Sequence, residues 1–199
     1  SGSISAGTSG GAGSILFGAY GSGDKPKLYG SEVISGWTKH SGNIYKATFN
    51  SSINQLFIGD SKMKVARHPN SGYMFINSVQ GSTSFSSGEL DGGINYAGAT
   101  WFGRTSVYFT STTTVTSSSS RSITLSSAPE GGLGVNRGFI LMNKLEFLDE
   151  AGEWFYDSNS KTVYLWLPDS DSPDNYTIRG SVHENGFYAN SINNLTIEN

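Results

Sequence analysis

Residues 154–167 read Trp154-Phe155-Tyr156-Asp157-Ser158-Asn159-Ser160-Lys161-Thr162-Val163-Tyr164-Leu165-Trp166-Leu167, and this stretch decides the fold class. Its two arms are rich in aromatic and β-branched residues, which favour strands because their side chains fit a pleated, half-buried surface. The segment Asp157-Ser158-Asn159-Ser160 between the arms consists of residue types that form turns. The stretch therefore predicts a β-hairpin.

Short apolar runs separated by Gly, Ser, Asn or Asp continue on both sides of this hairpin, and helical periodicity is nearly absent. Antiparallel strands are predicted at residues 56–58, 62–66, 73–79, 100–109, 113–115 and 122–125. Residues 111–121, nearly all Ser and Thr, resemble a linker, but their Thr-Val-Thr alternation suits an exposed hairpin better. Met142, Leu145 and Leu148 are three residues apart, which predicts one short helix within residues 139–148. The chain is therefore predicted to be all-β.

Composition limits the classes of function. The 199 residues carry 13 Lys and Arg against 16 Asp and Glu without a basic stripe, so we exclude nucleic acid, whose phosphates need clustered cations. There is no Cys, which excludes disulfides, a thiolate metal site and a Cys nucleophile. No apolar run approaches membrane-spanning length. The bias toward Gly, Ser, Thr, Asn and Tyr is typical of secreted bacterial β-proteins, so we expect an extracellular or cell-surface location.

Several stretches carry a family resemblance: Ser5-Ala6-Gly7-Thr8-Ser9-Gly10 with residues 15–26, Asn54-Gln55-Leu56-Phe57-Ile58 with Ala66-Arg67-His68-Pro69-Asn70, Gly152-Glu153-Trp154-Phe155-Tyr156-Asp157 with Val163-Tyr164-Leu165-Trp166-Leu167-Pro168, and residues 192–199. The first pair of stretches resembles the first rungs of secreted right-handed parallel β-helix proteins. The second pair resembles the start of an extra β-domain that interrupts the helix, and the third pair resembles the return from that insert. Residues 192–199 resemble the resumed helix. This family includes polysaccharide lyases and glycoside hydrolases. The short pieces of the last part, bounded by Asn, also suit the rungs of a solenoid.

The resemblance implies the start of a right-handed parallel β-helix in residues 1–50, an inserted antiparallel β-domain in residues 51–168 and resumed β-helix rungs in residues 169–199. It also implies the N-terminal section of an extracellular protein that degrades or binds polysaccharides, either a lyase or a hydrolase. In such proteins the catalytic groups usually lie on later rungs, so no catalytic residue is transferred and we expect this chain alone to be inactive. The alternative is a non-catalytic module of a cell-surface or adhesion protein.

Three side chains are candidates for binding a saccharide. Arg67, in Arg67-His68-Pro69-Asn70, could bind a sugar carboxylate through its planar fork, although a structural turn is the favoured interpretation. Trp101 and the nearby Tyr96 could stack on a sugar ring, because the C–H groups of the ring match an aromatic face. Burial of both aromatic side chains in the insert is the alternative that we favour.

Carboxylates suggest two further sites. Glu153 could act as a glycosidase acid if Asp149, Glu150 or Asp157 lay roughly 5–10 Å away, but a structural turn with Trp154 in the core is favoured. We expect no cofactor; the alternative is a bound calcium ion, for which Asp169, Asp171 and Asp174 would be the oxygen ligands. A solvated acidic turn is the favoured reading of these three aspartates, because their spacing is not that of an EF-hand.

The last strand-like segment predicts a partner. A parallel stack that stops at Ile197-Glu198-Asn199 would expose unpaired ladder groups together with the side chains of Leu195 and Ile197. Natural β-proteins seldom leave such an edge bare. We therefore expect it to be covered by the rest of a longer parent chain or by a symmetry-related copy.

Overall fold

The structure is a computed structural model that describes residues 15–189 and 194–198. The Ser5–Gly10 part of the family resemblance therefore lies outside the described residues, as do several positions of the last one. Within the described part, the chain is built from β-strands and two short 3-10 helices, η1 (Leu145–Phe147) and η2 (Pro173–Asn175). The prediction of an all-β protein is confirmed.

The described strands form four sheets. The two-stranded sheet pairs β1 (Ile15–Phe17) with β19 (Leu195–Ile197). The four-stranded sheet has the order β2 (Ser31–Val33), β18 (Ile178–Ser181), β5 (Leu56–Ile58) and β6 (Ser61–Lys62). The five-stranded sheet has the order β3 (Thr38–Ser41), β4 (Ile44–Thr48), β17 (Thr162–Trp166), β16 (Glu153–Asp157) and β7 (Lys64–Val65).

The eight-stranded sheet contains all the strands between residues 67 and 142. Its main path is β10 (Ser78–Gln80), β11 (Ser84–Ser86), β14 (Ser122–Leu125), β13 (Thr110–Ser119), β12 (Thr100–Arg104), β15 (Gly138–Met142) and β8 (Arg67–His68), and β9 (Met74–Phe75) pairs with β15 off this path. Residues 111–119 belong to the single strand β13, which forms a hairpin with β14 around residues 120–121, so the predicted hairpin is present with different bounds. The predicted short helix is reduced to η1, because residues up to Met142 continue β15.

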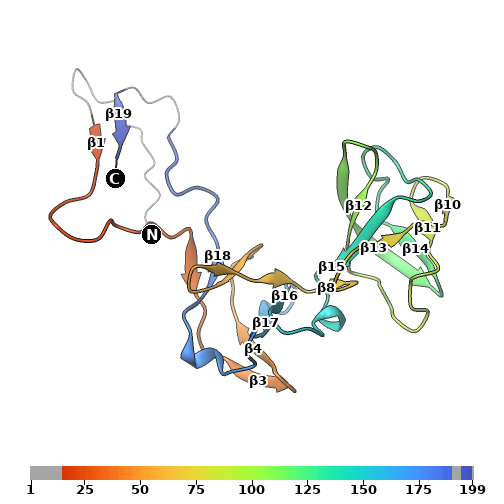
Figure 1. Cartoon of the computed structure of the whole chain (residues 1–199), viewed down its shortest axis with the longest axis horizontal. Coiled ribbons are helices and arrows are strands. Elements are labelled where there is room, and N and C mark those ends of the chain that lie inside the picture. Colours follow the sequence, from red (N-terminus) through yellow and green to blue (C-terminus); the bar gives the residue numbers. More distant parts are fainter. Residues whose placement is uncertain (1–14, 190–193, 199) are drawn as a thin grey trace.

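Most described strand pairs are antiparallel, including the predicted hairpin β16–β17, in which Trp154 lies opposite Leu165. Two pairs are parallel: β16 with β7, and β1 with β19, in which Ile15 lies opposite Leu195. This last pair joins the beginning and the end of the described chain side by side (Figure 1). The predicted parallel rungs are therefore represented, within residues 15–189 and 194–198, by one short pair.

Strand pairing crosses the predicted divisions at residues 50 and 168. β4 pairs with β17 through Ala47 opposite Val163, and β18 lies between β2 and β5. Figure 1 shows these two sheets between the β1–β19 pair at one end of the molecule and the eight-stranded sheet at the other. The chain thus enters the middle region before residue 50 and leaves it after residue 168.

Two hydrophobic cores lie on opposite faces of the β16–β17 hairpin. One face places Trp154, Tyr156, Val163 and Leu165 in a core with Leu56 and Ile178, which we call the Trp154 core. The other face packs Phe155, Tyr164 and Trp166 against a second core under the eight-stranded sheet, which we call the Trp101 core. Because side chains alternate along a strand, a hairpin with apolar residues at successive positions can serve both cores.

Candidate functional site

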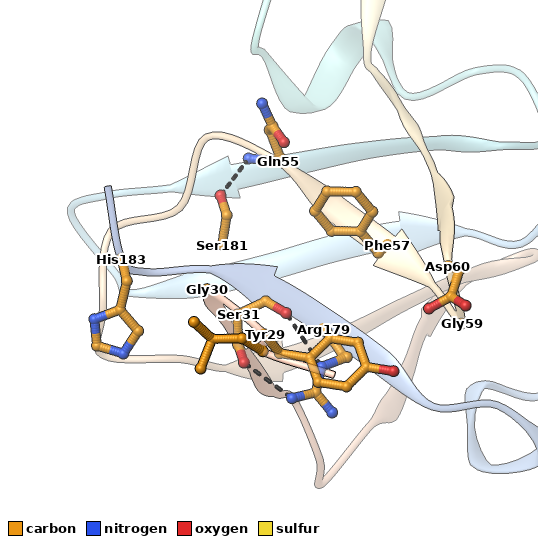
Figure 2. A pocket seen from close by; sticks show the side chains of 11 residues that line it. Tyr29, Gly30, Ser31, Gln55, Phe57, Gly59, Asp60, Arg179, Ser181 and His183 are labelled. Carbon is orange, nitrogen blue, oxygen red and sulfur yellow. Dashed lines mark hydrogen bonds between the residues drawn. The ribbon is translucent and has the colours of Figure 1, made fainter. Parts of the chain in front are cut away.

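A cleft of about 320 Å³ opens over the four-stranded sheet. Its lining includes Tyr29, Ser31, Gln55, Phe57, Arg179 and His183. In Figure 2, Arg179 lies beside Tyr29, and His183 and Asp60 lie toward opposite ends. Polar groups thus converge on a cleft that also has aromatic walls, as in many small-ligand sites. We call it the Arg179 cleft.

The guanidinium of Arg179 is fixed on one edge and one face. Its Nε donates to Ser31 Oγ at 3.1 Å, and its second terminal nitrogen donates to the Ser31 carbonyl at 3.0 Å. The guanidinium carbon lies 4.3 Å from the centre of the Tyr29 ring, which is a cation–π distance. These contacts tie β18 to β2 and hold the planar group in one orientation.

The other ionisable groups around the cleft have partners. Lys27 Nζ lies 3.4 Å from the Asp60 carboxylate, whose charge raises the pKa of this fully exposed lysine. His183 Nε2 lies 4.0 Å from Glu32 Oε1. Arg179, by contrast, has no carboxylate within salt-bridge distance among the described residues. The cleft therefore carries one positive charge without a described counterion.

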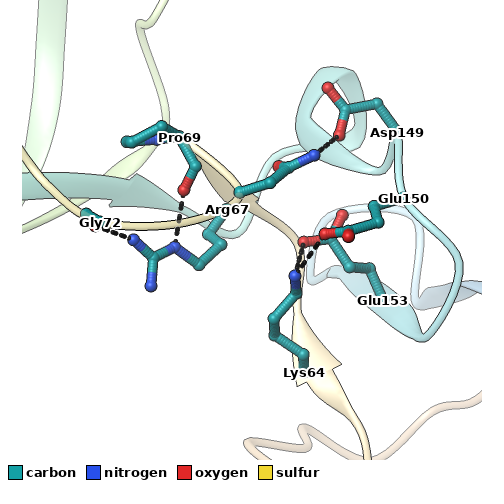
Figure 3. Close-up of polar contacts among 8 residues, drawn as sticks. Lys64, Arg67, Pro69, Gly72, Asp149, Glu150 and Glu153 are labelled. Carbon is teal, nitrogen blue, oxygen red and sulfur yellow. Dashed lines mark hydrogen bonds and ion pairs between the residues drawn. The ribbon is translucent and has the colours of Figure 1, made fainter.

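Arg67 takes part in a turn. Its Nε donates to the Pro69 carbonyl at 2.8 Å, and a terminal nitrogen donates to the Gly72 carbonyl (Figure 3). The guanidinium thereby holds the loop that follows β8, which corresponds to the turn favoured from the sequence. The saccharide role predicted for Arg67 stays a prediction, and these contacts lend it no support.

Trp101 and Tyr96 do not form a sugar platform. Both side chains have 0% exposure and belong to the Trp101 core. The idealised Cβ of an alanine at Gly103 would lie 2.0 Å from Trp101 Cζ2, so this glycine makes room for the indole. The burial that the sequence favoured is confirmed, and neither ring has an exposed face on which a sugar could stack.

Glu153 is buried with 0% exposure and precedes Trp154, which has 2% exposure. Lys64 Nζ lies 3.3 Å from one Glu153 oxygen and donates to Glu150 at 2.7 Å (Figure 3). Burial raises the pKa of the Glu153 carboxyl, and the charge of Lys64 opposes this rise. Burial also lowers the pKa of Lys64, but the hydrogen bond to Glu150 and the charge of Glu153 raise it overall.

A buried Glu153 has no access to a substrate, and its possible partners have other contacts. Asp149 accepts from Asn70 Nδ2 at 2.8 Å. Asp157 is at the hairpin turn, where hydrogen bonds from the Ser160 side chain and from backbone N–H groups lower its pKa. These residues form a structural ion pair and turn contacts, which is the interpretation that the sequence favoured, with Trp154 packed in the core.

The three aspartates proposed for calcium form local turn contacts. Asp169 accepts from the Asp171 N–H at 3.1 Å and from the Tyr176 hydroxyl, which lowers the pKa of Asp169. Asp171 accepts from Asn175 Nδ2 at 2.9 Å, and Asp174 is within 3.4 Å of the Ser172 hydroxyl. Within the described part of the chain, no group of three or more His, Asp or Glu side chains is arranged to hold a metal. The structure does not support the predicted calcium site.

A second pocket, of about 470 Å³, lies at the eight-stranded sheet. It is lined by Tyr73, Phe75, Arg104, Tyr108 and Phe109, among others, and Tyr108 is 91% exposed. Its exposed loop is ordered by its own contacts, because the Ser106 hydroxyl accepts from the N–H groups of Tyr108 and Phe109. We call it the Tyr108 pocket.

The sequence did not indicate the Arg179 cleft. Ser31 and Arg179 are 148 residues apart, and the contact exists only because β18 pairs with β2. The local signals that could have indicated Arg179 were weak: a single arginine followed by Gly180, with Tyr176 three residues before it. In the described residues, no helix is long and apolar enough to cross a membrane.

Comparisons with known proteins identify a fold but not a family. No protein-family model and no curated protein sequence matches the chain. A solved structure described as a "Glycoside hydrolase" matches with a TM-score of 0.71 and 19% sequence identity, over 85% of this chain and 35% of that chain. The chain thus spans about a third of the length of that protein and shares its fold over this region.

Proposed function

We propose that this chain is a section of an extracellular protein that binds or degrades polysaccharides, in which an antiparallel β-domain is inserted into a right-handed parallel β-helix. The observation that carries the proposal is the likeness of 85% of the chain to a glycoside hydrolase at a TM-score of 0.71. The parallel β1–β19 pair supports the β-helix, because it brings strands together that flank the whole intervening region.

The surface beside β1 and β19 is consistent with further rungs. A cavity of about 540 Å³ there is lined by Leu16, Phe17, Leu28, Phe187 and Ile197, among others. Leu16 is 59% exposed and Ile197 48% exposed. A β-helix buries such side chains against the next rung. We therefore include in the proposal that this apolar surface is covered by more of a parent chain or by a second copy of this chain.

A non-catalytic adhesion or binding module is the second candidate. The Tyr108 pocket favours it, because exposed contiguous aromatic side chains often mark an interaction surface and binding alone needs no acid–base pair. Both candidates are proposed to be extracellular. They differ in whether the parent protein cleaves polysaccharides or only binds them.

Polysaccharide binding and cleavage can be tested together. We expect the chain to be retained on at least one of pectin, alginate, glycosaminoglycan or xylan in affinity electrophoresis, and to release neither reducing ends nor unsaturated products. Retention on none of them would overturn the proposed function. Turnover that disappears in Glu153→Gln but persists in the exposed control Glu130→Gln would show instead that the chain is itself an enzyme.

A further inference from the structure

The Arg179 cleft has the size and composition of a site for one sugar unit or a short segment of a chain. Its volume of about 320 Å³ is at the lower end of the range of roughly 300–1,000 Å³ that small-ligand sites occupy. Tyr29 is 40% exposed and Phe57 is half-buried, so both leave apolar surface toward the cleft. The side-chain amide of Gln55 makes no hydrogen bond to any residue in the described ranges. It can therefore serve a ligand hydroxyl.

The charge of the cleft selects the kind of sugar. The Nε and one terminal nitrogen of Arg179 are occupied by Ser31, and Tyr29 covers one face of the guanidinium. The remaining terminal nitrogen donates to no described residue, and no described carboxylate neutralises the group. A planar guanidinium that is already oriented matches a carboxylate well, and charge-assisted hydrogen bonds are about twice as strong as neutral ones.

Asp60 also lines the cleft and would repel an anion, but its pairing with Lys27 and its position in the cleft weaken this repulsion. Lys27 Nζ lies 3.4 Å from its carboxylate, and Figure 2 shows Asp60 at the end of the cleft away from His183. Both side chains of this pair are largely exposed, so solvent screens the remaining field. The oriented, unpaired charge next to the aromatic walls is that of Arg179.

We propose that the Arg179 cleft binds an acidic sugar of a polysaccharide, with Arg179 holding the carboxylate of a uronic acid, the aromatic walls contacting the ring and Gln55 bonding a hydroxyl. This inference rests on the proposed function and names the substrate class. It transfers to Arg179 the chemistry that the sequence suggested for Arg67. Arg67 lies in the loop after β8, and its donors hold Pro69 and Gly72.

The test is a calorimetric titration of the whole chain with oligogalacturonate and oligomannuronate, compared with neutral xylo-oligosaccharides of equal length and with a sulfated oligosaccharide. We expect the uronates to bind and Arg179→Gln to weaken them about ten- to a hundredfold, as expected for a charged hydrogen-bonding group. Arg179→Lys should keep part of the affinity, because it keeps the charge and loses the planar fork.

Arg121→Gln is the matched control. This arginine is exposed, donates through one terminal nitrogen to the Gly88 carbonyl at 2.6 Å, and lines neither the Arg179 cleft nor the Tyr108 pocket. It should leave uronate affinity unchanged. If Arg179→Gln lowers the melting temperature, Gln55→Ala and the Lys variant provide the readout, since Gln55 contributes no described side-chain bond to the fold.

The outcomes separate the two proposals. Binding of neutral but not acidic oligosaccharides would overturn the acidic-sugar inference and leave the proposed function standing. Binding of the sulfated ligand alone would overturn the carboxylate assignment. Equal losses in the Arg179 and Arg121 variants, or no loss in either, would overturn the assignment of the binding site to the Arg179 cleft. Absence of binding to every oligosaccharide, together with no retention on any polysaccharide, would overturn both.

Discussion

The Trp101 core and the Trp154 core lie on opposite faces of one hairpin, and each buries a tryptophan whose indole nitrogen has no described hydrogen-bond partner. They differ in their surroundings. The Trp101 core is enclosed by antiparallel strands that are close in sequence, from residue 67 to residue 142. The Trp154 core is assembled from residues 34–65 and residues 154–182. These segments, together with the adjacent Glu153, also contain the Glu153–Lys64 pair and most of the lining of the Arg179 cleft. The charged features therefore lie where distant segments meet.

Removal of either tryptophan should give the largest loss of stability. We expect Trp101→Ala and Trp154→Ala each to lower the free energy of unfolding by about 3–5 kcal/mol, as is typical for truncation of a buried aromatic side chain. Because β16 and β17 contribute to both cores, each variant should unfold in one transition, measured by circular dichroism during urea titration. Tyr108→Ala, at a side chain that is 91% exposed, is the control and should be neutral.

Two outcomes would change the comparison. Separate transitions would show that the cores are independent folding units despite their shared hairpin. If Trp154→Ala left the urea midpoint of unfolding unchanged and weakened glycan binding, Trp154 would be an exposed ligand-binding residue and not part of a core.

A smaller effect is expected where the Trp101 core is packed most tightly. Gly103→Ala would place a methyl group 2.0 Å from Trp101 Cζ2, so either the indole or β12 must move. Overpacking of this kind lowers stability by about 1–3 kcal/mol, occasionally more. Gly23→Ala, where the new methyl group meets nothing within 4 Å, is the matched control. Equal midpoints for the two variants would show that the Trp101 core is loosely packed.

Local features of the fold could be predicted from the sequence. The hairpin β16–β17 was predictable because its alternating arms and its Asp-Ser-Asn-Ser turn lie within one short stretch. The burial of Trp154 followed from the same pattern. Trp101 was harder to interpret, because glycines beside an aromatic residue indicate either a loop or a close contact, and only the packing of Gly103 under the indole decides between them.

Long-range features could not be predicted in the same way. The pairing of β4 with β17 and the contact of Arg179 with Ser31 join segments more than a hundred residues apart. Neither contact leaves a periodic pattern in the sequence. This explains why the pairing of β4 with β17 across residue 50 and the contact of Arg179 with Ser31 were not predicted.

The smallest effect concerns Glu153, and its size depends on pH. The folded chain raises the pKa of this carboxyl above its usual 4.5, mainly by burial. Below pH 4.5 the group is protonated in both states and does not oppose folding. As the pH rises above 4.5, the unfolded chain ionises first and binds fewer protons than the folded chain. Stability is therefore lost between 4.5 and the raised folded pKa, and the loss is complete above it.

Glu153→Gln should remove this decline, because the amide does not titrate. Lys64 would keep Glu150 as a partner at 2.7 Å, so the variant does not leave the lysine unpaired. We expect the stability of the variant relative to the wild type to increase as the pH rises through this window, measured by urea unfolding on both sides of pH 4.5. Glu150→Gln, which leaves Glu153 in place, should retain the decline. If the wild-type and Glu153→Gln profiles ran parallel, the ion pair with Lys64 would compensate fully for burial, and the Trp154 core would tolerate a charge at its border as well as it tolerates an amide.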